Sequence, residues 1–519
     1  MKIKIIKNIT STVTIIMKLS LSALLLLVIM PGLLQAQSMS EFEQWKKQYV
    51  GEFKQYKDEM DKEFANFLNQ KWKPFETEKG KVRDKSPKPV NIPVAKVKEE
   101  PKPAVAVKPT PQKLPDPKPA IKIKPPVPPV VSIPAPVIKP PKPETVSPIP
   151  IVLPENSSEK LVRISFLGYQ LSIIDSISES TGRLQDRANQ KAIQQDFSKL
   201  AQSDYPKTIE QLLKLKKQLK LNDWAYVQLI ESFSSKLLYS SNSKNIISWF
   251  VMLKSGLDAR IAFSDREIFL LVAVKQNLYD IAFFTFGSQK YYTVTKQKKL
   301  PTNLYSYDGK YPKKLDISDF SLVRGINTRQ NNQIRRLSFS YANKSYDLKV
   351  AYNRNTVDFL STYPQMDINQ YFSTPLESDT ADSLLSQLRP IVNQMSETEA
   401  VNLLLRFVQK AFPYETDQDQ FGAENYLFIE ETLHYPASDC EDRSIFFSWL
   451  VKNLLNIEVI ALDFPGHIAT AVLLKKPTGQ VVRFKGKRYT IADPTYINAR
   501  VGMKMPQYKN INPKVINSL

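Results

Sequence analysis

The chain has 519 residues, with 72 Lys and Arg against 51 Asp and Glu, which gives a formal net charge of +21. One cysteine excludes an internal disulfide framework and a thiolate zinc cluster, and two histidines leave little for a His-rich metal site. Any bound metal is therefore expected to take oxygen ligands. The length allows two or three domains, and so large a charge would ordinarily indicate a polyanionic partner.

Residues 1–36 have the pattern of a secretory signal peptide. An apolar run over residues 19–30 is preceded by lysines and followed by a small-residue cleavage pattern that ends at Ala36. We expect translation to begin at Met1 or Met17. The alternative is an uncleaved anchor, but a run of about 12 residues is short for a span that needs ~20. The sequence therefore predicts a periplasmic or secreted protein with no transmembrane span after signal cleavage.

Residues 38–76 predict a long amphipathic helix with one aromatic stripe. Its large apolar residues recur every three to five positions in a charged sequence: Phe42, Trp45, Tyr49, Phe53, Tyr56, Met60, Phe64, Phe67 and Trp72. Because such a stripe must be covered, we expect residues 39–75 to dock on the globular part of the chain, to self-associate, or to bind a partner protein of the cell envelope. The interleaved acids disfavour anionic lipid.

Residues 81–156 predict a disordered linker rich in proline and lysine. Residues 81–154 hold 22 of the 37 prolines and a net charge of +9, and the signal segment holds a further +4. An extended polyproline II-like tether at ~3.1 Å per residue would reach roughly 200 Å. Because most of the excess charge lies in these two segments, we exclude nucleic acid as a partner.

The last domain, residues 380–519, carries the candidate chemistry. Cys440 is followed by apolar residues at helical spacing, and Ser438 or Asp439 is a natural N-cap. The thiol is thus expected in the first turn of a buried helix. There the unpaired backbone N–H groups and the helix dipole favour the thiolate, so a lowered pKa of Cys440 is expected, and the same N–H groups can bind an oxyanion.

A hairpin and a further strand are predicted after this helix. The apolar stretch 458–462 leads through a turn to a second strand that His467 opens. Asp493 ends a third strand, because Pro494 cannot continue the ladder. A thiol nucleophile needs a base, and the base needs a third residue that fixes its tautomer, so each of these roles has one candidate.

These motifs resemble the Cys, His and Asp motifs of the transglutaminase-like superfamily, whose core is similar to that of papain. The resemblance covers roughly residues 395–510 and implies an α+β fold, with the cysteine on a helix N-terminus that packs on an antiparallel sheet. It implies Cys440 as nucleophile, His467 as general base and acid, and Asp493 as the residue that orients His467. A second oxyanion donor is expected, and we assign it to Gln409 from its place upstream.

The acids around Cys440 further resemble those of bacterial periplasmic cysteine proteinases of this superfamily, in which acidic neighbours of the cysteine bind calcium. The resemblance implies a Ca²⁺ site at Asp439 and Glu441, and oxygen ligands suit calcium. Ser438 stands where that subgroup usually has Gly. The alternative is that the acids cap the helix N-terminus and that no cofactor is required.

Structural roles are the alternative for each member of the triad. A lone helical cysteine is most often a small buried hydrophobe, and a lone histidine on a strand is most often a satisfied core or surface residue. The presence of all three motifs in the expected order favours the catalytic interpretation. His434, six residues before Cys440, is interpreted as structural.

Residues 158–310 predict a helical and α+β region that contains an inactive copy of the same unit. Residues 221–295 can be aligned without gaps to the residues 200 positions later in the chain. This alignment places Ser240 at the position of Cys440 and Glu267 at that of His467. A serine without a histidine cannot be activated in the same way. Coincidence is the alternative, and the lack of a helix packed on a three-stranded sheet would refute the repeat.

Between the two copies, residues 311–375 predict an antiparallel meander. Alternating residues flank Asn-containing turns, and Thr356 to Leu360 is expected as the third strand. Helices are expected to follow at about 380–395 and 397–411.

The sequence thus predicts an exported thiol enzyme that performs amide hydrolysis or acyl transfer on a protein substrate in the cell envelope. Hydrolysis is favoured over cross-linking, because of the resemblance to the bacterial proteinases. The alternative is a non-enzymatic envelope scaffold or binding module that uses a transglutaminase-like fold as a docking platform.

Overall fold

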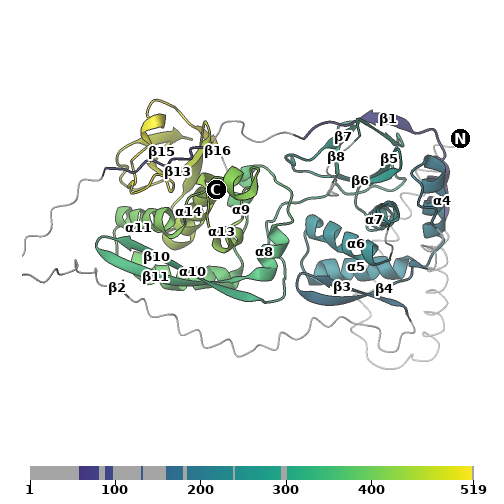
Figure 1. Ribbon diagram of the computed structural model, residues 1–519, viewed down its shortest axis with the longest axis horizontal. Coiled ribbons are helices and arrows are strands. Elements are labelled where there is room, and N and C mark those ends of the chain that lie inside the picture. The colour runs from purple at the N-terminus through teal and green to yellow at the C-terminus, as the bar shows by residue number, and fades with distance from the viewer. Residues whose placement is uncertain are drawn as a thin grey trace, which may run out of the picture. The chain divides into compact units, whose positions relative to one another are not determined.

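The computed structural model describes residues 58–80, 88–96, 130–131, 159–178, 184–237, 240–293 and 301–516. It mixes helices with mainly antiparallel sheets, as the α+β expectation requires (Figure 1). The predicted signal peptide and residues 38–57 lie outside the described residues. Within the described part of the chain, every helix is too short or too polar to cross a membrane.

Residues 159–306, the first lobe, begin with a β-hairpin and end with a sheet. The elements in chain order are β3 Leu161–Phe166, β4 Tyr169–Ile174, α4 Gln190–Ala201, α5 Pro206–Gln218, α6 Asp223–Leu237, α7 Ser241–Lys254, β5 Ala259–Ser264, β6 Glu267–Ala273, β7 Phe283–Phe286, β8 Gln289–Thr293 and β9 Asn303–Ser306. A further strand, β1 Lys73–Glu76, joins the sheet at its edge, in the order β1-β9-β5-β6-β8-β7. Helix α7 covers β5 and β6.

Residues 332–516, the second lobe, also begin with a hairpin and end with a sheet. The elements are β10 Asn332–Tyr341, β11 Lys344–Asn353, α8 Arg354–Leu360, α9 Ile368–Ser373, α10 Ser378–Val392, α11 Glu397–Ala411, α12 Asp417–Phe421, α13 Ile429–His434, α14 Cys440–Leu455, β12 Val459–Phe464, β13 His467–Val472, β14 Val481–Phe484, β15 Lys487–Ala492, the 3₁₀ helix η1 Pro506–Tyr508 and β16 Lys514–Ile516. Helices α10 and α11 lie between the hairpin and α14, which covers β12 and β13.

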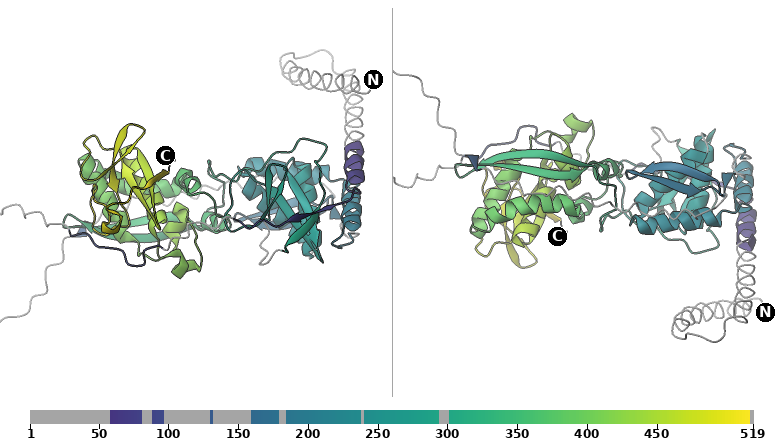
Figure 2. Two further views of the ribbon diagram at one scale, coloured as in Figure 1. Left: turned by 90° about the horizontal axis from the view of Figure 1, so that it is seen from above. Right: turned by 90° about the horizontal axis from the view of Figure 1, so that it is seen from below.

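The two lobes share one topology. In each, one helix packs on the second strand of the hairpin, the next packs on the first strand, and a third covers an antiparallel sheet in which five strands have the same order; in the first lobe β1 adds a sixth. The order β7-β8-β6-β5-β9 of the first lobe repeats as β14-β15-β13-β12-β16 in the second. The hairpins can be followed in the right-hand view of Figure 2. The helix-on-sheet arrangement that the predicted repeat requires is therefore present, and the match extends beyond residues 221–295 to both hairpins.

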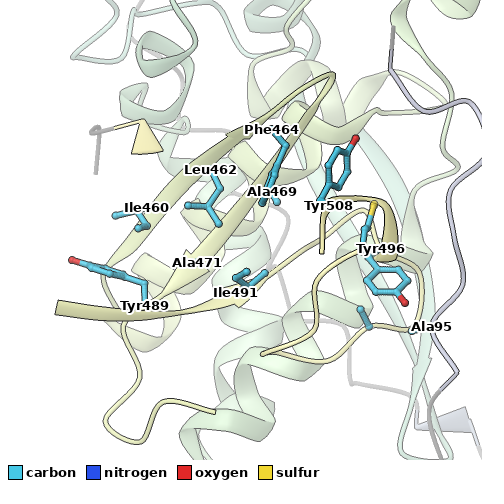
Figure 3. Close-up of a cluster of buried hydrophobic side chains, with 12 residues drawn as sticks. Ala95, Ile460, Leu462, Phe464, Ala469, Ala471, Tyr489, Ile491, Tyr496 and Tyr508 are labelled. Atoms are coloured by element: carbon cyan, nitrogen blue, oxygen red, sulfur yellow. The ribbon is translucent and has the colours of Figure 1, made fainter. Parts of the chain in front are cut away.

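The central strands β12 and β13 of the second-lobe sheet are buried on both faces. Helix α14 lies on one face, and a cluster of apolar side chains covers the other (Figure 3). Alternate residues of β12 join this cluster with inward residues of β13 and β15, because successive strand side chains point to opposite faces. Tyr496, Tyr508 and Ala95 complete the cluster. The strand ends near His467 are thus held in a rigid, close-packed setting.

The predicted helix over residues 38–76 is wrong at its C-terminal end. The described helix covers residues 58–67, and Lys73–Glu76 forms strand β1, which pairs with β9. Pro74 cannot continue a helix, and Phe75 packs on Phe286 with ring centroids 4.3 Å apart. The preceding Trp72 packs on Phe263 and Tyr307, so this part of the aromatic stripe is covered by the first lobe.

The predicted meander over residues 311–375 contains two strands of the expected three. Strands β10 and β11 pair in full register, but Thr356 to Leu360 lies in helix α8. Asn353 caps that helix by accepting the Asn355 N–H at 3.1 Å. The other edge of β11 pairs with Val130–Val131 in parallel. The helices expected at about 380–395 and 397–411 are confirmed as α10 and α11.

Candidate active site

Cys440 is the first residue of α14, and its side chain is fully buried. Asp439 occupies the N-cap position, as one of the two expected caps. The Cys440 thiol donates to Glu441 Oε2 at 3.0 Å and accepts the Ile468 backbone N–H at 3.5 Å. The structure therefore places the thiol in the first turn of the helix, against the start of strand β13.

The segment before Cys440 is anchored to the chain upstream. Ser438 donates its backbone N–H to Pro413 O at 3.1 Å. The buried Arg443 guanidinium donates to Phe412 O at 2.6 Å and to Ser438 Oγ at 3.3 Å. These bonds fix the turn from which α14 begins, because buried backbone groups are costly to leave unpaired.

His467 and Asp493 come together at the ends of neighbouring strands. His467 Nε2 lies 2.9 Å from Asp493 Oδ2, and both side chains are buried. The other carboxylate oxygen, Asp493 Oδ1, accepts the backbone N–H groups of Thr495 and Tyr496 at 2.9 and 3.2 Å. The Tyr508 ring stacks on the imidazole at a centroid distance of 5.3 Å and an interplanar angle of 9°. Together these contacts fix the orientation of the imidazole.

His467 Nδ1 is buried and has no hydrogen-bond partner among the described residues. The next residue, Ile468, donates its N–H to the Cys440 sulfur and accepts the Ser444 hydroxyl at 3.0 Å through its carbonyl oxygen. These two bonds tie the first turns of α14 to the strand that begins at His467. The three predicted triad residues therefore lie on adjoining elements.

Gln409 lies in the same region, on α11, but does not fit the predicted oxyanion role in this conformation. Its amide Nε2 donates to Asp493 O at 3.2 Å and to Ala499 O at 3.1 Å. Both N–H hydrogens are therefore engaged by backbone carbonyls. Gln409 instead holds the loop that carries Asp493.

Four carboxylates gather beside Cys440 and enclose one lysine. The Lys88 ammonium pairs with Asp439 and Glu441, with Glu424 Oε2 at 2.7 Å and with Asp417 Oδ2 at 3.3 Å. The predicted metal ligands Asp439 and Glu441 are fully buried. They belong to a cluster that also contains Asp417 and Glu424, which the sequence did not indicate. Burial lowers the pKa of Lys88, but the charges of Glu441 and Asp439 outweigh this effect and raise the pKa.

The expectation of a lowered pKa for Cys440 is wrong for this conformation. Burial raises the pKa of the thiol well above its usual value, and the negative charges of Glu441 and Asp439 raise it further. The helix dipole favours the thiolate by a modest amount, which these two effects exceed. Burial also opposes ionisation of Glu441, yet the Lys88 ammonium lowers the pKa of that carboxyl. The site as it stands holds a protonated thiol beside a carboxylate.

Asp442 has the capping role that the sequence left open for these acids. Its carboxyl accepts the backbone N–H of Leu427 at 3.0 Å and that of Asp439 at 3.3 Å. Burial, then the charges of Asp417 and Glu441, raise its pKa well above the usual value. The acids of this turn therefore divide into one that caps the helix and two that pair with Lys88.

The corresponding place in the first lobe contains different groups. Asn242 Oδ1 accepts the Ile268 N–H at 2.8 Å, where the Cys440 sulfur accepts the Ile468 N–H in the second lobe. Ser240 is the N-cap of α7, as Asp439 is of α14, which corrects its predicted alignment with Cys440. Counted from the caps, Ser241 stands at the position of Cys440, and Asn242, one residue later, makes the equivalent bond to the strand. Glu267 opens β6 as His467 opens β13. The described part of the first lobe thus offers neither a thiol nor an imidazole here.

His434 has the structural setting that was expected. Its Nδ1 lies 3.0 Å from the Tyr352 hydroxyl, and its Nε2 lies 2.7 Å from the Arg354 guanidinium. Burial, followed by the charge of Arg354, lowers the pKa of this imidazole. His434 therefore connects α13 to strand β11 and the start of α8.

No protein-family model, curated protein or solved structure matches the chain.

Four residues of the site were not predicted from the sequence: Lys88, Asp417, Glu424 and Tyr508. An acidic stretch over residues 415–424 was a signal for the two acids. Lys88 was one of many lysines in a proline-rich segment, and no local pattern distinguished it.

Proposed function

We propose that the second lobe is a transglutaminase-like, papain-like thiol enzyme that hydrolyses amides or transfers acyl groups on a protein substrate. The observation that carries the proposal is the imidazole of His467, which uses Nε2 for Asp493 and whose Nδ1 has no hydrogen-bond partner in the described part of the chain. The neighbouring Ile468 N–H reaches the Cys440 sulfur. A thiol, a base with one ring nitrogen free and an orienting carboxylate are the groups that nucleophilic acyl transfer needs.

In the proposed reaction, the Cys440 sulfur attacks a substrate amide carbonyl. The thiol proton passes to His467 Nδ1 as the C–S bond forms, and the imidazolium then gives that proton to the leaving amine as the C–N bond breaks. Water, or a second amine, then attacks the thioester carbonyl and gives a proton to His467 Nδ1; the C–S bond breaks, the acid or the new amide leaves, and the imidazolium returns the proton to the Cys440 sulfur. Asp493 stabilises the imidazolium through Nε2, and the N–H groups that open α14 stabilise the oxyanion.

A divalent cation fits the acidic cluster as a proposed cofactor. The donors are carboxylate oxygens of Asp417, Glu424, Asp439 and Glu441, and carboxylate oxygens suit calcium. Asp439 Oδ1 is buried and has no hydrogen-bond partner within the described ranges. Bound Ca²⁺ would offset the charges of Glu441 and Asp439, the two acids that raise the thiol pKa.

The first lobe is proposed to be an inactive copy of the second. The shared sheet order and the shared helix-to-strand bond support this relationship. Asn242 and Glu267 cannot perform the chemistry of a thiol and an imidazole. We therefore assign the reaction to the second lobe alone.

A non-enzymatic envelope scaffold is the second candidate function. It is favoured by the complete burial of Cys440, the near-complete burial of His467 and the raised pKa of the thiol. Under this alternative the acids and Lys88 stabilise a docking platform, and the thiol never ionises.

Capture of substrates tests the proposal. The full chain with Cys440→Ala is used to retain partners from the envelope fraction, and these partners are then incubated with the wild-type chain. Cleavage or cross-linking that depends on Cys440 supports the enzyme, and mass spectrometry of the products separates the two reactions. An Asn242→Ala chain serves as control, because it alters the equivalent site in the first lobe. Captured partners that stay intact would favour the scaffold.

A further inference from the structure

Residues 88–96 of the proline-rich segment are in contact with the second lobe. The linker was expected to be solvated throughout, yet the Lys88 side chain is only 9% exposed and Ala95 is buried. Ala95 donates its backbone N–H to Ile497 O at 2.8 Å, and Val94 forms a parallel bridge with Ile497. We call residues 88–96 the strap.

The two ends of the strap contact different parts of the second lobe. At one end, Lys88 pairs with the two acids that flank Cys440. At the other, Ala95 bonds to Ile497 and belongs to the apolar cluster on the sheet, together with Tyr496 and Tyr508 (Figure 3). An extended segment therefore passes from the acids beside the thiol to the loop that follows Asp493.

The contacts of the strap are those of a bound peptide. Its charged side chain lies among four carboxylates, Ile92 packs on the apolar cluster, and its main chain bonds to the edge of a loop. When a protein binds an extended peptide, hydrogen bonds to the peptide main chain supply affinity, and subsites for its side chains supply specificity. A buried ammonium among carboxylates is a demanding arrangement, since either partner alone would be an unpaired buried charge.

We propose that Asp417, Glu424, Asp439 and Glu441 form a subsite for the lysine of an extended peptide, and that the strap is its resident, autoinhibitory occupant. The proposal rests on the proposed function only in calling the strap inhibitory. After the strap leaves, the subsite would take either the lysine of an extended protein substrate or the proposed divalent cation, since both need the same four carboxylates.

Hydrogen exchange in a full chain that carries Cys440→Ala tests the strap without any need for turnover. The Ala95 amide is expected to exchange at least about tenfold faster when Lys88→Met is added, because loss of the buried ion pairs releases the strap. Lys96→Met is the matched control, since Lys96 is exposed at the other end of the same strap. Its Ala95 amide is expected to stay protected.

A synthetic peptide of residues 88–96, labelled at its C-terminus, tests the subsite in trans. It is expected to bind the Cys440→Ala, Lys88→Met chain at least about tenfold more tightly than the Cys440→Ala chain, whose subsite is occupied. A peptide with Lys88→Met should bind neither chain. Glu424→Gln in the receptor chain should weaken binding of the lysine peptide. Hydrogen exchange in the first lobe should stay unchanged, which shows that the variant is folded.

Equal hydrogen exchange at Ala95 in the Lys88→Met and Lys96→Met chains would overturn the inference that the Lys88 ion pairs hold the strap on the second lobe. Equal binding of the lysine and methionine peptides would overturn the lysine subsite. Because every readout is made without the thiol, these results are separate from the question of catalysis. A released strap and a specific peptide site in a chain without Cys440-dependent turnover would leave the inference standing and remove the proposed function.

Discussion

His467 bonds to Asp493 through Nε2 at 2.9 Å, and its Nδ1 is buried with no hydrogen-bond partner among the described residues. Asp493 can hold this arrangement because its second oxygen accepts two backbone N–H groups, from Thr495 and Tyr496. The carboxylate is thus oriented by the chain that follows it. The imidazole is in turn oriented by the carboxylate and by the ring of Tyr508.

Asp493→Asn is expected to abolish most Cys440-dependent turnover with little change in the fold. An asparagine Oδ1 that keeps the two backbone N–H bonds turns its NH₂ toward His467 Nε2. That donor forces the imidazole proton onto Nδ1, which can no longer accept the thiol proton. The expected loss of turnover is on the order of 10²–10⁴-fold, measured on captured substrate. Tyr508→Phe, which keeps the stacking ring, should retain turnover, and equal effects of both substitutions would contradict the assigned roles.

The local motifs of the second lobe could be predicted because each depends on neighbouring residues. The apolar spacing after Cys440, the alternation before His467 and the stop at Pro494 determine a helix start, a strand start and a strand end. Their assembly into one site followed from the resemblance. Residues 356–360 were predicted as a strand but form part of helix α8, because their apolar residues fit both the alternation of a strand and the spacing of a helix. The N-cap at Asn353 favours the helix.

The cluster around the thiol could not be predicted, because it depends on contacts distant in the sequence. Lys88 and Glu441 are separated by 353 positions, and nothing in a Lys-Pro repeat distinguishes one lysine from the next. The sign of the Cys440 pKa shift depends on that geometry, since burial and two acids oppose the helix dipole. The likeness of the two lobes also extends further than the sequence indicated. The hairpins match in topology and packing, and not in residue pattern.

Glu441→Gln is expected to increase the rate at which iodoacetamide alkylates Cys440 at pH 7.5. The substitution removes the negative charge of a carboxylate that accepts a hydrogen bond from the thiol. The thiol pKa therefore falls and the thiolate fraction rises. Each unit of pKa is worth about tenfold in thiolate while the thiol is mostly protonated. Since the raised pKa places ionisation above neutral pH, wild-type alkylation should increase steadily as the pH rises.

Asp442→Asn is the matched control for this prediction. It lies in the same helical turn, but its carboxyl bonds to the backbone of Leu427 and Asp439 and not to the thiol. Repeating both substitutions with Lys88→Met separates the charge effect from release of the strap. If Glu441→Gln and Asp442→Asn alter the alkylation rate equally, Glu441 does not control the thiol.

Calcium is expected to bind the Lys88→Met chain at least about tenfold more tightly than the wild type. The ammonium occupies the place among the four carboxylates that a cation would take, so the two compete. Titration calorimetry with Ca²⁺ measures the difference, and Asp417→Asn in the Lys88→Met background should weaken binding. No heat of binding in the Lys88→Met chain would reject the calcium assignment of Asp439 and Glu441.

Asn242→Ala is expected to destabilise the chain by about 1–3 kcal/mol and to leave Cys440-dependent turnover unchanged. Asn242 accepts the Ile268 N–H and donates to Arg266 O, and its removal leaves these backbone groups without partners. Urea unfolding measures the loss, with the exposed Ser241→Ala as the neutral control. A loss of turnover without a loss of stability would show that the first lobe takes part in the reaction.

Glu431→Gln is expected to stabilise the protein at pH 8 and to have little effect at pH 4. Burial raises the pKa of Glu431 from 4.5 to about 8, although the Phe428 N–H, which its Oε2 accepts at 3.0 Å, opposes the shift. A carboxyl with a raised folded-state pKa ionises first in the unfolded chain, so wild-type stability falls as pH rises from about 4.5 to about 8. Glutamine keeps the acceptor and removes the ionisation, which should recover about 2–4 kcal/mol at pH 8. Thermal unfolding across this range measures the difference, with the exposed Glu415→Gln as control for the loss of one charge. Parallel stability curves for wild type and Glu431→Gln would show that this carboxyl is not held neutral in the fold.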